Sequence, residues 1–129
     1  MNKSVPDPVL LRRIRSNVIE LLELYASEEK QRQYQRNVPW VSVPVELVEM
    51  WFSDTYHLEE PSLRLAFNAV ERDALARFHS HFDQITRGQR RIAFGPDLEE
   101  LLRDERWRQL MVEAAVVLRI VKSPDVTTA

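Results

Sequence analysis

The sequence predicts an all-α fold, a compact bundle of four to five helices with a long N-terminal helix. Only two glycines occur in 129 residues, and glycine weakens helix interiors more than any residue except proline. Apolar residues recur at three- and four-residue steps over several stretches, which is the spacing of one helix face. The length suits one domain with its own core, so we expect a single helical domain over 1–129, with flexible ends at 1–6 and 123–129.

The first helix is expected to begin at Asp7-Pro8, since aspartate is a favoured N-cap residue and proline suits the first helical position. Beyond residue 26 the apolar stripe stops, and Tyr34 is the one large apolar side chain of 27–36. The sequence leaves open whether the helix continues there; a continuous helix would bury little in that half and would project. The stripe before it comprises Leu11, Ile14, Val18, Leu21, Leu22 and Tyr25.

Two short segments have extended character. Residues 38–44 read VPWVSVP, rich in β-branched residues and bracketed by prolines, which favours an extended conformation. Residues 63–67 alternate apolar and other side chains, a pattern that fits a short strand or a first helical turn. A short two-stranded pairing of 38–43 with 63–67 is therefore left open.

Further helices are expected to begin at Pro44, after Asn68, at 96–97 and after Asp104. Asn68 and Glu71 resemble a capping box, with asparagine in place of the usual serine or threonine. The side chains expected to face the core are Val45, Val48, Trp51 and Phe52 in the second helix, Ala74, Leu75, Phe78, Phe82 and Ile85 in the third, Leu98, Leu101 and Leu102 in a short fourth, and Trp107, Leu110, Met111, Ala114, Val117, Leu118 and Val121 in the last.

Three spacings resemble those of a group of small uncharacterised bacterial helical proteins. They are Pro44-x-Glu46-Leu47 with Trp51, Phe67-x3-Glu71-x3-Leu75-x2-Phe78, and Pro96-x-Leu98 leading to Trp107-x2-Leu110. The resemblance covers about residues 38–120 and implies a helical fold. It implies no activity.

Composition excludes several function classes. The chain has no cysteine, which excludes disulfides, thiolate zinc sites and a cysteine nucleophile. Two glycines are too few for a phosphate-binding loop or a dinucleotide fingerprint. A net charge of -2 makes nucleic acid an unlikely partner. No apolar run approaches the ~20 residues of a membrane span, so we expect a cytoplasmic protein that does not bind membranes.

The histidines carry the alternative hypothesis, a small enzyme or small-ligand-binding protein with a site between helices. Its polar groups would be His57, His79 and Asp83, because histidine is the commonest general base and His79 lies one helical turn from Asp83. His79 and His81 point about 200° apart on a helix and cannot share one metal. No second carboxylate–histidine pair accompanies Asp54 and His57, so we expect no metal and no cofactor.

Aromatic residues outside the helical stripes carry the first hypothesis, a non-catalytic protein-interaction module of the adaptor or toxin-neutralising type. Trp40 and Tyr34 would anchor a protein partner or a second copy of the chain, because tryptophan, tyrosine and arginine dominate interface hot spots. The competing interpretation is that Trp40 closes one end of the bundle, and that cations after the third helix stabilise its C-terminus. The expected polar rim consists of Arg32, Arg36, Arg90 and Arg91.

Overall fold

The computed structural model describes residues 7–55, 61–88, 91–92 and 95–122. This part of the chain is all-α, as predicted, and contains no strand. The expected count of four to five helices is wrong, because the described residues alone form seven α-helices and one π-helical segment. They are α1 (Pro8–Ala26), α2 (Glu28–Asn37), α3 (Val43–Glu49), the π-helical η1 (Met50–Thr55), α4 (Pro61–Leu65), α5 (Ala69–Arg87), α6 (Leu98–Arg103) and α7 (Glu105–Lys122).

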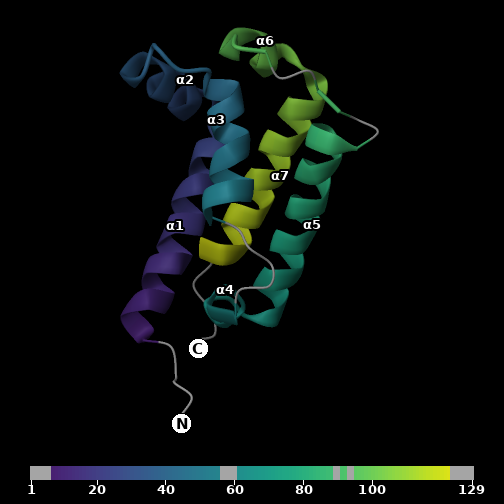
Figure 1. Cartoon of the computed structure of the whole chain (residues 1–129). Helices are drawn as coiled ribbons and strands as arrows, with labels where there is room; N and C mark the ends of the chain where they lie inside the picture. The colour runs from purple at the N-terminus through teal and green to yellow at the C-terminus, as the bar shows by residue number, and fades with distance from the viewer. Residues whose placement is uncertain (1–6, 56–60, 89–90, 93–94, 123–129) are drawn as a thin grey trace.

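The long helices α1, α5 and α7 run alongside one another, with α7 packed against both of the others (Figure 1). The α3–η1 rod lies against them, α2 and α6 lie at one end of the bundle, and α4 lies at the other (Figure 1). Rings from four of these elements meet in the core. Phe82 lies 5.3 Å from Tyr25 and 5.9 Å from Trp107, and Trp51 lies 5.1 Å from Phe78, measured between ring centroids.

The expected N-terminal helix is divided in two at Ser27. Ser27 has extended backbone angles, and its hydroxyl accepts a hydrogen bond from the Lys30 N–H at 3.0 Å, which caps α2. Residues 27–36 were expected to bury little if they were helical. The helix α2 nevertheless has a side chain in the core, since Gln31 is fully buried. The Nε2 of Gln31 donates to the carbonyl oxygens of Leu24 and Tyr25, both at 3.1 Å. A buried glutamine thus satisfies backbone groups at the end of α1.

The two segments with extended character form no strand pairing in the described structure, and the pairing left open above is therefore wrong. Residues 39–40 form a turn, and 63–65 belong to the short helix α4. Because α3 begins at Val43, the four-residue step places Val43, Leu47 and Trp51 in the core. Val45, expected to face inward, is exposed.

The later helices follow their predicted faces closely. The capping box is present, with the Glu71 N–H donating to Asn68 at 2.8 Å and the Asn68 N–H donating to Glu71 at 2.9 Å. All five predicted core residues of α5 are buried. Six of the seven in α7 are buried as well, and the seventh, Leu118, is half-buried. Asp104 accepts from the Arg106 N–H at 2.9 Å before α7, as expected of an N-cap.

Arg15 joins α1 to α5, to α7 and to the turn that follows α4. Its guanidinium donates two hydrogen bonds to the Glu71 carboxylate, at 2.9 and 2.7 Å. It also donates to the carbonyl oxygens of Ala66 and Val121, at 3.0 and 2.8 Å. Burial alone would raise the pKa of Glu71, but hydrogen bonds from Arg15 and the Asn68 N–H, with the Arg15 charge, hold that pKa below its usual range.

Candidate protein-interaction surface

Trp40 lies in the turn between α2 and α3 and is 78% exposed. It is the only aromatic residue that is exposed in the part of the chain that the structure describes. The tryptophan therefore does not close the end of the bundle. A large apolar side chain in this position leaves most of its surface in water.

Hydrogen bonds on both sides fix the turn that carries Trp40. The Val38 N–H donates to the Tyr34 carbonyl at 3.0 Å, and the Val41 N–H donates to the Val38 carbonyl at 3.2 Å. The Gln35 side-chain amide donates to the carbonyls of Val38 and Val41, at 3.3 and 3.4 Å. Trp40 is thus exposed on a turn whose backbone conformation is held by hydrogen bonds.

Tyr34, the second expected anchor, is half-buried and packs against the core. Its hydroxyl donates to Oε1 of Glu46 at 3.4 Å, which joins α2 to α3. Burial, with the charge of Glu46 and this hydrogen bond, raises the pKa of Tyr34. Tyr34 holds the base of the turn, and the structure leaves only part of its side chain for a partner.

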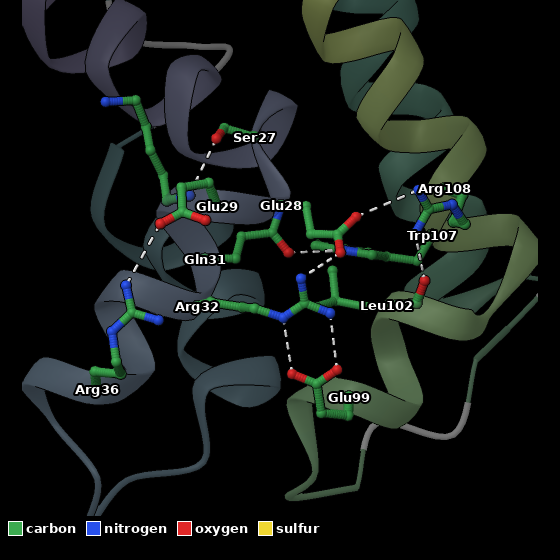
Figure 2. A network of polar contacts seen from close by, with 11 residues as sticks. Ser27, Glu28, Glu29, Gln31, Arg32, Arg36, Glu99, Leu102, Trp107 and Arg108 are labelled. Atoms are coloured by element: carbon green, nitrogen blue, oxygen red, sulfur yellow. Dashed lines mark hydrogen bonds and ion pairs between the residues drawn. The ribbon is translucent and has the colours of Figure 1, made fainter.

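Arg32 is engaged within the fold. Figure 2 shows its guanidinium between two carboxylates, Glu28 on its own helix and Glu99 on α6. Both of its hydrogen bonds to Glu99 measure 2.9 Å. The bonds to Glu99, followed by those to Glu28, raise the pKa of Arg32 and outweigh desolvation. The predicted rim residue therefore fastens α2 to α6.

The other expected rim residues are divided among different places. Arg36 is exposed on α2, and its guanidinium reaches Glu29 at 3.5 Å (Figure 2). It also donates to the side-chain oxygen of Gln33 at 3.3 Å. Arg91 is exposed after α5, and its carbonyl accepts from Arg106 at 2.8 Å. Arg90 lies outside the described residues. Arg36 is thus the predicted arginine that shares the α2–α3 region with Trp40 and remains exposed.

Two of the three residues of the alternative ligand site, His79 and Asp83, are described, and both contact other side chains of the fold. His79 is half-buried, and its Nδ1 accepts from the Trp51 indole N–H at 3.1 Å. Burial lowers the pKa of His79. The charge of Asp83 opposes this shift, and the charge of Arg87 adds to it. Asp83 accepts from Nε of Arg87 at 2.7 Å. His57 lies outside the described residues.

No group of three or more histidine or acidic side chains is placed to hold a metal within the described residues. One polar pair was missed at the sequence level: Nδ1 of His81 lies 2.8 Å from Oε1 of Glu113, across the seam between α5 and α7. Helix spacing relates residues on one helix only, so a pair between two helices gives no periodic signal.

None of the described helices is long and apolar enough to cross a membrane. No protein-family model, curated protein or solved structure matches this chain. Its function is therefore inferred from the residues and contacts above.

Proposed function

We propose that the protein is a non-catalytic interaction module that binds a protein partner through Trp40. The observation that supports the proposal is the 78% exposure of this tryptophan on a hydrogen-bonded turn. An anchor held in its bound position loses little conformational freedom on binding. Tryptophan is also the residue type most enriched among interface hot spots.

The surroundings of Trp40 suit such a contact. Pro39 and Val45 are exposed on either side of it in the sequence, and Arg36 is exposed at the end of α2. An apolar centre with an arginine at its edge has the composition of an interface core with a polar rim. Removing a hot-spot tryptophan costs about 2 to 4 kcal/mol of binding free energy, roughly 30- to 1,000-fold in affinity.

The same geometry favours binding over the small-ligand alternative. The Nδ1 of His79 accepts a hydrogen bond from Trp51, and Asp83 pairs with Arg87. Groups already satisfied within the fold are poor candidates for convergent ligand contacts. Within the proposed class, an adaptor and a toxin-neutralising protein both act by covering a partner surface. The cysteine-free chain fits the reducing cytoplasm as the place where it acts.

A nuclease-treated pull-down from the source cells, with the complex sized by light scattering, tests the proposal. We expect a stoichiometric protein partner that Trp40→Ala weakens by about 30-fold or more, while circular dichroism stays unchanged. Val9→Ala serves as the control, because Val9 is 51% exposed on α1. A partner retained by Trp40→Ala at full affinity would show that the anchor is wrong, and a complex with the mass of two chains would identify a second copy as the partner.

A further inference from the structure

The turn that carries Trp40 comprises residues 38–41. Its ends are joined by the Val41 N–H, which donates to the Val38 carbonyl at 3.2 Å. Pro39 stands at the second position, where proline is favoured because its ring fixes the φ angle near the value that the turn needs. Neither Pro39 nor Trp40 has a positive φ angle, as in a type I turn. Trp40 therefore occupies the third position of a regular turn.

Gln35 stands in the last turn of α2 and reaches across both ends of this turn. Its Nε2 atom donates to the carbonyl oxygens of Val38 and Val41, at 3.3 and 3.4 Å. A carboxamide nitrogen carries two hydrogens, which is one for each of these carbonyls. An ionised glutamate has nearly the same shape but no hydrogen to donate. The two bonds therefore depend on the residue type as well as on its position.

The hydrogen bonds of Gln35 are local, in contrast to those of Gln31 one helical turn earlier on α2. Gln31 is fully buried, and its side chain bonds to groups on α1 and α7. Gln35 is half-buried, and both of its hydrogen bonds stay within residues 35–41. Losing the bonds of Gln35 would therefore act on the turn and leave the packing of the bundle in place.

We propose that Gln35 is the positioning residue of the Trp40 site and thereby sets how tightly the site binds its protein partner. The inference rests on the proposed binding through Trp40. A loosened turn presents the tryptophan in its binding conformation only part of the time, and the apparent affinity falls by that fraction. If the fraction drops to between about one third and one tenth, the affinity drops by about three- to tenfold.

Packing at the two ends of the turn separates this role from a general effect on stability. Val38 and Val41 lie against the core, so the loss of Gln35 should free residues 39–40 without unfolding α2 or α3. A side chain that only stabilised the fold would lower the melting temperature and leave the mobility of Trp40 unchanged. The two roles therefore predict different measurements.

The test compares ¹⁵N relaxation of the full natural chain with that of Gln35→Glu and Gln35→Met. The first variant keeps the shape and removes both donors, and the second removes them without adding a charge. In both, the order parameter of the Trp40 backbone amide should fall from about 0.85 to below about 0.6, with the melting temperature changed by no more than about 2 °C. Gln33→Glu is the matched control, because Gln33 contacts Arg36 and makes no hydrogen bond to the turn.

Binding is measured by calorimetry, with the partner protein that the natural chain retains in the nuclease-treated pull-down as the probe. Both Gln35 variants should bind it about three- to tenfold more weakly, and Gln33→Glu should bind it at full affinity. An unchanged Trp40 order parameter in the Gln35 variants, or a lowered one with undiminished affinity, would overturn the role of Gln35 while Trp40→Ala still weakened binding. Full retention of the partner by Trp40→Ala would instead overturn the anchor, and the role of Gln35 with it.

Discussion

Gln31 and Trp107 meet in the core, where the Trp107 indole N–H donates to Oε1 of the Gln31 side chain at 3.1 Å. The same amide donates through Nε2 to the last carbonyls of α1. One uncharged polar side chain thereby satisfies groups on α1 and α7 while standing on α2. Because the Gln31 side chain is fully buried, its loss would remove three hydrogen bonds from the core at once.

Replacing Gln31 by leucine is expected to destabilise the protein by about 2 to 4 kcal/mol, although leucine is more apolar. The substitution keeps the volume but removes the hydrogen bonds that the Gln31 side chain makes to Trp107, Leu24 and Tyr25. Urea denaturation measures the free energy of unfolding. Gln33→Leu is the control, because Gln33 is exposed on the same helix, and we expect it to change stability by less than about 0.5 kcal/mol. Equal effects of the two substitutions would contradict the assigned role.

The free energy of unfolding should fall strongly when either buried tryptophan is truncated and hardly change when the exposed one is. Trp51 and Trp107 are fully buried, and truncation to alanine should cost about 3 to 5 kcal/mol each. Trp40→Ala should change the free energy of unfolding by less than about 0.5 kcal/mol, because its side chain already lies in water. Thermal denaturation of the three variants measures this, and acrylamide should quench the Trp40 emission most strongly. A large loss of stability in Trp40→Ala would show that Trp40 packs within the fold.

Glu71 should make stability depend on acid. Its pKa is lowered in the folded state, so its contribution is present above the unfolded pKa of about 4.3 and is lost as the pH falls through the folded pKa. We expect Glu71→Gln to cost about 1 to 3 kcal/mol at pH 7, a range reduced because Arg15 is partly exposed. The difference from the natural chain should shrink below about pH 4.

Urea denaturation from pH 7 to pH 3 tests the Glu71 prediction. Asp73→Asn is the matched control, because its pair with Arg77 is exposed and worth about 0.5 kcal/mol or less. If the destabilisation by Glu71→Gln stays constant over the whole pH range, the ion pair with Arg15 is not its cause.

The helix faces were predictable because periodicity encodes which side of a helix is buried. In α5 the stripe from Ala74 to Ile85 and the capping box at Asn68 were both predicted and are both present. The inward face of α3 was predicted only in part. Trp51 is buried as expected, but Val43 and Leu47 share its face at four-residue steps, whereas Val45 is exposed and Val48 is half-buried.

Polar contacts between helices account for most of what the sequence did not predict. Gln31 sits in a polar run that gives no apolar signal, yet its partner Trp107 is 76 positions away in the chain. Arginine is a residue type common at interfaces, but the guanidinium of Arg32 is already ion-paired with Glu99 on α6. Trp40 was identified correctly as standing outside the helical stripes, since this required only local reading.

His79 should give stability a second pH dependence, at milder acidity. Burial lowers its pKa below the ordinary value of about 6.5, so the unfolded chain takes up a proton more readily than the folded chain. The stability that it contributes is complete above the unfolded pKa and falls as the pH drops from about 7 to 5. We expect this loss to be smaller in His79→Gln. The Trp51 indole N–H resonance should move over the same range, because protonation of Nδ1 removes its acceptor; identical pH profiles for both proteins would refute the assignment.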